Sequence, residues 1–404
     1  MMSKISVLDV SLHNRPVGTI THLPGDQTLF SFGEAYIEDE NRPTLSLSFK
    51  DVYGGLLTGF RPVQTRVPPF FSNLLPEGAL RRYLAGRAGI KEAREFPLLG
   101  ILGGDLPGAV VVRPAEGEEW PAGDDHQHDE DEGRAMRFSL AGVQLKFSAV
   151  MGARGGLTIP ASGAGGDWII KLPSATYTGV PENEFSMMEL ARHAGIDVPE
   201  VKLVPVQGVG GLPVGTDEIG GDAFAIRRFD RGADHKRIHM EDFAQIFSVF
   251  PERKYQKANY CNLAEVIWTE IGTPGVIEFV RRLVFNALIG NADMHLKNWS
   301  LIYPDGRTPA LAPAYDFVST IAYIEDEKMA LNLAPASTKR FADLDLEAFR
   351  RLANKVGAPA KIVTDAVDET RTRFDEAWKR EKSTLPLSKG VIAAVEEHRA
   401  TLKL

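Results

Sequence analysis

The sequence is poor in the residues that build disulfides and metal clusters. Its 404 residues contain one cysteine, Cys261, which excludes an internal disulfide and any zinc site built on several cysteines. No run of 18 apolar residues occurs, so the sequence indicates no membrane-spanning helix. Residues 1–7 lack the apolar stretch of a secretion signal. These absences predict a cytoplasmic protein without a membrane partner.

Positive charge is also in short supply. Lysine and arginine number 46, against 54 aspartate and glutamate residues, and the net charge is −8. Nucleic-acid binding relies on a basic surface that neutralises phosphates. We therefore do not expect the chain as a whole to bind DNA or RNA directly, although a local basic face is compatible with this balance.

The length of the chain predicts more than one structural unit. A chain of 404 residues exceeds what one hydrophobic core usually holds, and its 44% hydrophobic content is ordinary for a globular protein. Composition and periodicity predict four regions: an α+β N-terminal unit at 1–115, an acidic linker at 116–135, a small nucleotide-binding lobe at 136–232 and a mostly helical catalytic lobe at 233–404. Within the first unit we predict strands at 5–10, 45–49 and 109–112 and a single helix at 73–85, with its start near the Pro-Glu-Gly of 76–78.

The acidic stretch offers a candidate metal site that we do not favour. His126 and His128 lie there among carboxylates, and these residue types can bind divalent cations. The stretch is almost free of apolar residues, so nothing near it holds a coordination geometry. A solvated linker is the better interpretation.

Three residues in the C-terminal half point to phosphoryl transfer. Asp293 and Asn298 are five residues apart, which is the spacing between the base and the metal-binding asparagine of a protein-kinase catalytic loop. Asp316 follows, and a hairpin between Asn298 and Asp316 would bring two hard oxygen ligands to one cleft, as Mg²⁺ prefers. Each residue alone is typical of a turn or a helix cap. The set favours catalysis, with Asp293 as the base.

Two lysines fit the same chemistry. Lys171 lies in the apolar run Trp-Ile-Ile-Lys-Leu-Pro, where a lysine is costly unless its head group reaches a partner. Nucleotide phosphates are one such partner, and the alternative is a lysine at a strand edge that reaches into water. Lys297, next to Asn298, is placed to stabilise charge on a transferred phosphoryl group.

Two further stretches give weaker signals. Residues 139–146, Ser-Leu-Ala-Gly-Val-Gln-Leu-Lys, form neither a G-x-G-x-x-G nor a Walker A motif, and a strand with a turn explains them as well as a phosphate loop does. Residues 225–231 place three arginines and an aromatic residue at the end of a strand. This pattern suits either a hinge beside adenine or a basic surface run.

Taken together, these motifs resemble the HipA family of bacterial serine/threonine kinases, the toxin components of type II toxin–antitoxin pairs. The resemblance covers nearly the whole chain in the family's order, and its most specific part is 291–316. It is carried by residues 139–146, 169–173, 182–185, 228–231, 291–298 and 315–316, with 73–78 and 104–109 in the N-terminal unit.

The resemblance implies a role for each matching residue. Asp293 would be the catalytic base, Asn298 and Asp316 would hold Mg²⁺, and Ser139 would be autophosphorylated, which silences the kinase. A phosphate there would repel ATP or refold the loop. The nucleotide contacts would be Ala141, Gly142, Val143, Gln144, Leu145, Lys146, Lys171, Arg227, Arg228, Phe229, His295, Leu296, Lys297, Asn298, Tyr315 and Asp316. Departures from the family pattern fall at Leu145, Met294 and Leu296.

The resemblance also implies a fold and partners. The expected fold class is α+β, with a two-lobed protein-kinase-like fold that adds an N-terminal α+β subdomain. ATP and Mg²⁺ would be required, the partner would be a HipB-like DNA-binding antitoxin that carries the contact with operator DNA, and an aminoacyl-tRNA synthetase is the implied protein substrate. A small-molecule kinase of the aminoglycoside type is an alternative, which Asn291 disfavours because that position usually holds histidine. A catalytically inactive, antitoxin-binding co-repressor is another, which the intact Lys171, Asp293, Asn298 and Asp316 disfavour.

Overall fold

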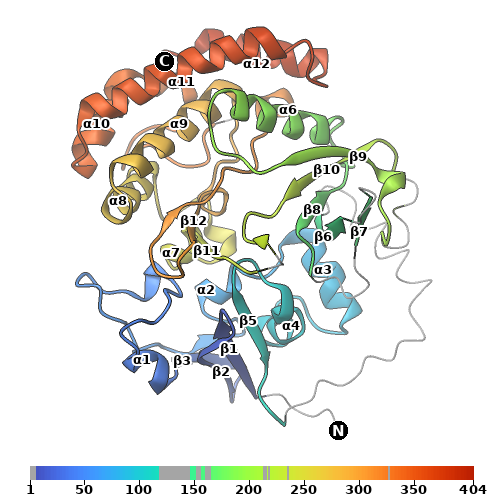
Figure 1. The fold of residues 1–404 in the computed structure, drawn as a ribbon, viewed down its shortest axis with the longest axis vertical. Helices are drawn as coiled ribbons and strands as arrows, with labels where there is room; N and C mark the ends of the chain where they lie inside the picture. Colours follow the sequence, from blue (N-terminus) through green and yellow to red (C-terminus); the bar gives the residue numbers. More distant parts are fainter. Residues whose placement is uncertain are drawn as a thin grey trace.

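The described chain folds around three hydrophobic cores (Figure 1). The computed structural model describes residues 6–117, 146–151, 156–159, 165–212, 216, 219–233, 236–325 and 328–404. One core belongs to the N-terminal unit, a small one to the sheet that follows, and the largest to the helical C-terminal part. Among the described residues, no helix is both long and apolar enough to cross a membrane.

The N-terminal unit is an antiparallel sheet of order β4-β3-β2-β1-β5 with short helices against it. Its first hairpin turns at His13 and Asn14, both with positive φ, as a tight turn between twisted strands requires. The strands are β1 Val7–Leu12, β2 Arg15–Leu23, β3 Gln27–Phe32, β4 Val63–Gln64 and β5 Val110–Pro114. The helices are α1 Glu34–Glu38, α2 Pro69–Ser72, α3 Gly78–Arg87 and α4 Glu95–Leu102.

One prediction for this unit was wrong and another was right in part. The predicted strand at 45–49 is a 3-10 turn at Leu47–Phe49, because the Leu47 amide and the Ser46 hydroxyl bond to the Glu241 carboxylate and not to a neighbouring strand. The helix predicted within 73–85, with its start near 76–78, is α3, which begins at Gly78, whereas residues 73–77 are not helical. This segment packs on the C-terminal part of the molecule.

The second sheet is antiparallel, of order β7-β6-β8-β10-β9, and helix α6 covers one face of it. β10 alternates between two cores: Phe224 and Ile226 join the large core, whereas Ala223 and Ala225 join the small one. Its elements are β6 Lys146–Met151, β7 Leu157–Thr158, β8 Trp168–Lys171, α6 Val180–His193, β9 Val201–Pro205 and β10 Asp222–Arg227.

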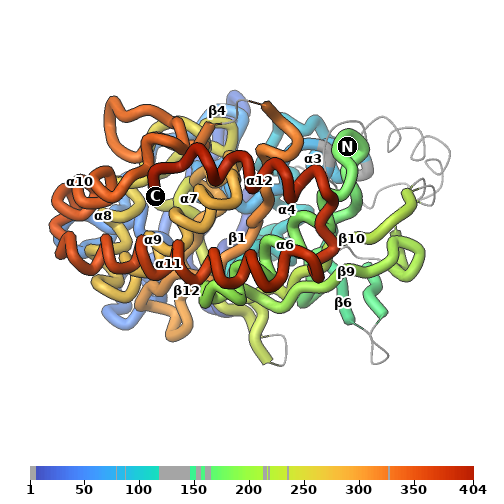
Figure 2. The backbone as a smooth tube through the Cα atoms, turned by 90° about the horizontal axis from the view of Figure 1, so that it is seen from above, coloured from blue at the N-terminus to red at the C-terminus, as the bar shows by residue number. Residues whose placement is uncertain are grey.

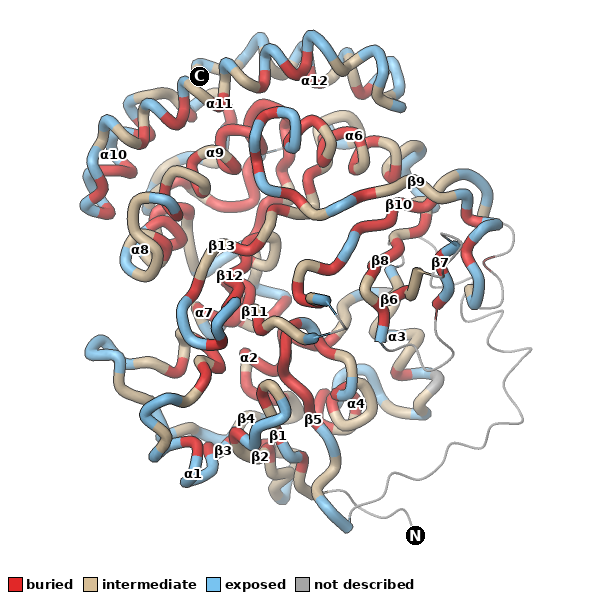
Figure 3. The backbone as a smooth tube through the Cα atoms, in the orientation of Figure 1, coloured by how far each residue is buried: buried red, intermediate tan, exposed pale blue. Residues whose placement is uncertain are grey.

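The C-terminal part is mostly helical, as predicted, around the buried helix α9 (Figure 3). The last three helices run along the outer side of the molecule. Figure 2, which looks down on this side, shows α11 and α12 in front of the other elements, and Figure 3 shows that their outer faces are exposed. The helices are α7 Phe243–Ile246, α8 Tyr260–Glu270, α9 Thr273–Ile289, α10 Leu346–Val356, α11 Ala360–Glu381 and α12 Lys389–Thr401. A small sheet of β11 His239–Asp242, β12 Ser300–Tyr303 and β13 Ala310–Leu311 lies between this lobe and the N-terminal unit (Figure 1).

Candidate active site

The loop that carries Asp293 begins abruptly where α9 ends. Gly290 adopts φ 64°, the left-handed conformation that glycine tolerates and that commonly ends helices. A side chain here would also collide with Ile321, because a Cβ would lie 2.4 Å from its Cγ1. The loop therefore runs directly from a buried helix into β12, and a rigid element on each side positions it.

Asn291 ties this loop together and is 1% exposed. Its Nδ2 donates to Asn286 Oδ1 at 2.7 Å and to the main-chain oxygen of Asp316 at 3.1 Å. Its Oδ1 accepts from the amide of Asp293 at 3.0 Å. One buried amide side chain thus links the backbone of Asp293 to that of Asp316.

The Asp293 carboxylate faces solvent and holds a hydroxyl at hydrogen-bond distance. Its side chain is 50% exposed, and the Tyr255 hydroxyl donates to Oδ1 at 2.5 Å. His295 Nε2 lies 3.8 Å from the same oxygen. Burial lowers the pKa of His295 to about 4, against the opposing effect of Asp293, so this imidazole is neutral at pH 7. Asp293 therefore meets the geometric requirement for a general base toward a hydroxyl group.

Asn298 and Asp316 line one small pocket. Asn298 Nδ2 donates to the main-chain oxygen of Asp293 at 2.7 Å, and within the described chain its Oδ1 has no hydrogen-bond partner. A carboxylate and an amide oxygen suit Mg²⁺, which often takes one or two protein ligands together with phosphate oxygens. The described residues contain no group of three or more His, Cys, Asp or Glu placed to hold a metal ion by themselves.

Lys171 connects the small sheet to Asp316 and to helix α6. Its ammonium lies 2.5 Å from Glu184 Oε1 and also bonds to an Asp316 oxygen. Glu184 is 3% exposed. Asp316 has φ 58°, an uncommon conformation for a residue other than glycine and one that concentrates at functional sites. A strand lysine paired with a helix glutamate is a required feature of active protein kinases.

Charge compensation differs within this cluster. Burial would raise the pKa of Asp316, but the Lys171 and Lys146 ammonium groups outweigh it and lower the pKa to about 2. Burial raises the pKa of Glu184 to about 7, although Lys171 opposes the rise. The two carboxylates outweigh burial at Lys171 and raise its pKa. Lys171 and Asp316 are therefore both charged at neutral pH, and Glu184 is the member whose charge responds to pH.

A second lysine lies beside Lys171 on the small sheet. Lys146 on β6 lies directly opposite Lys171 on β8, so both side chains lie on one face of the sheet. The Lys146 residue is partly open to solvent, yet desolvation by the surrounding protein lowers the pKa of its ammonium group. Two neighbouring ammonium groups repel each other unless an anion lies between them. Ser139 and the predicted phosphate-side residues Ala141–Leu145 lie outside the described residues, as do His126 and His128.

Lys297 contacts the N-terminal unit. Its ammonium lies 2.8 Å from Glu77 Oε1 and donates to the main-chain oxygen of Asn73 at 3.0 Å. Lys254 lies 3.0 Å from the other carboxylate oxygen of Glu77. Burial would raise the pKa of Glu77, but the two lysines lower it to about 2. Lys297 and Lys254 are therefore both held by one carboxylate, which comes from the N-terminal unit.

The predicted hinge residues divide into structural and accessible ones. Arg228 is 8% exposed, and its guanidinium pairs with Asp230 and Asp105. Arg227 is more than half exposed, and the Phe229 ring packs against Tyr315 with centroids 5.6 Å apart. The Arg228 side chain is therefore not available to a nucleotide. The candidate nucleotide contacts of this segment are its main chain and the Phe229 ring.

Comparison with known families decides the assignment. The model described as the HipA-like C-terminal domain matches residues 138–378, and the HipA N-terminal domain matches residues 8–113. The chain belongs to the HipA family. These two matches include every residue to which we assigned a role in the reaction, among them Ser139 at the start of the longer one.

Relatives of this HipA-family chain extend over its full length. "Putative kinase Y4dM" of Sinorhizobium fredii is 56% identical over 100% of this chain and 98% of that protein. "Putative kinase Y4mE" of the same organism is 32% identical over 91% of this chain and 90% of that protein. Among solved structures, a complex of HipA, HipB and operator DNA from Shewanella oneidensis contains a chain with a TM-score of 0.74 and 20% identity, covering 98% of this chain and 96% of that one. The two-lobed kinase-like fold is thereby confirmed.

Three contacts of the site escaped the sequence analysis: Glu184, Tyr255 and Glu77. Glu184 offered a signal, since it lies three and four residues before the apolar side chains of Met187 and Met188 in helix α6, and a buried carboxylate needs a partner. Glu77 lies in the motif 73–78 that carries the family resemblance, but nothing in the sequence brings it to Lys297, and Tyr255 offered no signal at all.

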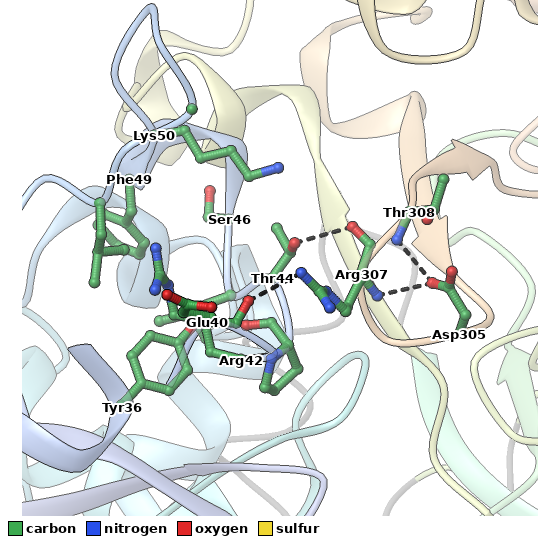
Figure 4. A pocket seen from close by; sticks show the side chains of 14 residues that line it. Tyr36, Glu40, Arg42, Thr44, Ser46, Phe49, Lys50, Asp305, Arg307 and Thr308 are labelled. Atoms are coloured by element: carbon green, nitrogen blue, oxygen red, sulfur yellow. Dashed lines mark hydrogen bonds between the residues drawn. The ribbon is translucent and has the colours of Figure 1, made fainter. Parts of the chain in front are cut away.

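A separate polar cavity of about 530 Å³ lies between the N-terminal unit and the turn that joins β12 to β13 (Figure 4). Arg307 crosses from that turn, donating to Glu40 O at 3.1 Å and to Asn41 Oδ1 at 2.9 Å. Thr44 Oγ1 donates back to Arg307 O at 3.0 Å. None of the candidate catalytic residues lines this cavity, so it is distinct from the site around Asp293.

Proposed function

We propose that this HipA-family chain is an ATP- and Mg²⁺-dependent serine/threonine protein kinase. The observation that carries the proposal is the contact of Lys171 with both Glu184 and Asp316, close to the loop that bears Asp293 and Asn298. Phosphoryl transfer needs held phosphates, a placed metal ion and an oriented hydroxyl group. Family membership and the kinase-like fold support the same reaction class.

Each residue has a distinct task in this proposal. Lys171 and Lys146 hold phosphate oxygens, and Asn298 and Asp316 supply oxygen ligands for Mg²⁺, whose charge would neutralise the phosphate oxygens. Asp293 orients the acceptor hydroxyl and takes its proton as the hydroxyl oxygen bonds to the γ-phosphorus, while the bond from that phosphorus to the bridging oxygen breaks and ADP leaves. The main chain of Arg227 to Phe229 and the Phe229 ring form the adenine side. His295, Leu296 and Tyr315 support the loop around the nucleotide.

The proposal extends to regulation and partners. Ser139 is the proposed site of autophosphorylation, which would place about −1.5 to −2 charge next to the phosphate-binding residues and silence the enzyme. The solved complex contains HipA, HipB and operator DNA, which supports a HipB-like antitoxin as partner and DNA contact through it. A translation enzyme such as an aminoacyl-tRNA synthetase is the proposed target. The net charge of −8 agrees with an indirect contact with DNA.

Autophosphorylation tests the proposal directly. Protein treated with phosphatase and then freed of it is incubated with γ-labelled ATP and Mg²⁺, and the modified peptide is mapped by mass spectrometry. We expect label on Ser139, none in Ser139→Ala, and none when Mg²⁺ is chelated. Asp316→Asn should also abolish labelling, because it removes a metal ligand and the partner of Lys171.

Two outcomes would contradict the proposal. Absence of label on the wild-type protein, with ATP binding also absent, would favour the inactive co-repressor. Transfer to an aminoglycoside but to no protein hydroxyl would favour a small-molecule kinase.

A further inference from the structure

A segment of the N-terminal unit reaches into the candidate active site. Asn73 anchors it by donating from Nδ2 to the main-chain oxygen of Val249 at 2.7 Å. The main-chain oxygen of Asn73 in turn accepts from Lys297 Nζ at 3.0 Å. The segment ends at Glu77, the extended residue that precedes α3. This is the motif 73–78 that the sequence analysis identified and to which the proposed reaction assigns no task.

The contacts of Glu77 are unusual for its place in the fold. A polar side chain that immediately precedes a helix commonly accepts from the free amides of the first turn. The Glu77 side chain makes no such bond. Its two carboxylate oxygens instead meet Lys297 at 2.8 Å and Lys254 at 3.0 Å, both in the catalytic lobe. The Glu77 carboxylate therefore binds two lysines of the catalytic lobe and does not cap helix α3.

The two lysines belong to two segments that both touch Asp293. Lys297 lies in the same loop as Asp293, one residue before Asn298. Lys254 precedes Tyr255, whose hydroxyl donates to Asp293 Oδ1 at 2.5 Å. A main-chain hydrogen bond from Leu296 to Lys254, 3.3 Å long, joins the same two segments. The Glu77 carboxylate thus bridges the loop that carries Asp293 and the segment that carries Tyr255.

Resting on the kinase function proposed above, we propose that Glu77 is a positioning residue of the active site. It holds the Lys297 ammonium in place, with the main-chain oxygen of Asn73 as a second acceptor and the Asp242 carboxylate 3.9 Å away. Through Lys254 it also holds the segment that carries Tyr255. The N-terminal unit therefore completes the catalytic site and is required for the full rate of transfer.

The test is a set of steady-state kinetic measurements on the full chain with labelled ATP. Glu77→Gln keeps the shape of the side chain and removes its charge, and we expect kcat to fall about tenfold with a smaller change in the KM for ATP. Lys297→Met should lower kcat at least as much. Because Glu77 acts through both Lys297 and Lys254, adding Glu77→Gln to a variant that already carries Lys297→Met and Lys254→Met should slow transfer no further.

Glu252→Gln is the matched control. Glu252 pairs with Arg66 of the N-terminal unit at 2.6 Å, so the substitution removes another ion pair between the same two units, one that involves neither Lys297 nor Lys254. It should retain wild-type kcat. If Glu77→Gln melts well below the wild type, Glu77→Asp, which keeps the charge but is too short to reach both lysines, takes its place.

Two results would overturn the inference: a kcat for Glu77→Gln within twofold of that of Glu252→Gln, or a further loss of similar size when Glu77→Gln is added to the variant that lacks both lysines. An inactive wild-type protein would instead contradict the proposed function.

Discussion

A lysine in an apolar strand needs a partner for its ammonium group, and Lys171 has two. The sequence left two interpretations of this residue, a phosphate-binding lysine and one that reaches into water at a strand edge. Its side chain is 12% exposed and contacts the carboxylates of Glu184 and Asp316, so the second interpretation was wrong. The same ammonium joins the small sheet, helix α6 and the proposed metal ligand.

The role of Glu184 can be tested by a change of a single charge. Glu184→Gln keeps the shape of the side chain but leaves Lys171 with Asp316 as its sole carboxylate. We expect transfer from ATP to fall by about ten- to a hundredfold, because the lysine is no longer held toward the phosphates. Glu189→Gln is the control on the same helix, since Glu189 pairs with Arg192 at the surface. Equal rates for the two variants, measured by label incorporation, would contradict this role.

Spacing in the sequence predicted the residues whose relationships are local. Asp293, Asn298 and Asp316 lie on consecutive segments, so a kinase-like spacing was enough to group them, and the structure places Asn298 and Asp316 in one pocket. Glu77 lies 220 residues before Lys297, and no periodicity in either segment indicates that they meet. Contacts of that kind depend on how the units pack, which a single sequence does not reveal.

At the scale of elements, the predictions that failed, wholly or in part, lie where the N-terminal unit packs on the catalytic lobe. Residues 45–49 have the composition of a strand, but the Glu241 carboxylate accepts hydrogen bonds from the Ser46 hydroxyl at 2.5 Å and from the Leu47 amide at 2.9 Å. Tyr303 donates to the same carboxylate at 2.5 Å. The predictions that succeeded, such as the strands at 5–10 and 109–112, which are observed as β1 and β5, rest on local apolar runs bounded by turn residues.

The buried Glu241 carboxylate makes the stability of this interface depend on pH. Burial raises its pKa from 4.5 to about 7, although its hydrogen-bond donors oppose the rise. The folded state therefore holds this proton between about pH 4.5 and 7 while the unfolded state releases it, so the Glu241 contribution to the free energy of unfolding falls as pH rises through that window.

Urea unfolding at several pH values measures this effect. Between pH 5 and 7.5 the wild-type protein should lose more stability than Glu241→Gln, which has no proton to lose at that position. Parallel curves for the two proteins would show that Glu241 does not titrate there.

At the scale of the whole molecule, the N-terminal unit is joined to the kinase-like part at two places that the proposed function uses. The motif 104–109 binds the proposed hinge, where Asp105 pairs with Arg228 and Arg231, and the amide of Gly108 donates to Asp230 at 2.8 Å. The motif 73–78 binds the catalytic loop through Glu77. Both motifs were recognised in the sequence through the family resemblance, but their contacts were not.

The central claim is that Asp293 promotes phosphoryl transfer while other residues hold the nucleotide. Its most direct test measures, on the same preparations of wild type and Asp293→Asn, the affinity for ATP with Mg²⁺ and the rate of label transfer to protein hydroxyl groups. We predict that ATP affinity stays within about threefold and that transfer falls by about 10²-fold or more, as expected for loss of a general base. Transfer by Asp293→Asn at the wild-type rate, with nucleotide bound equally well, would contradict the claim.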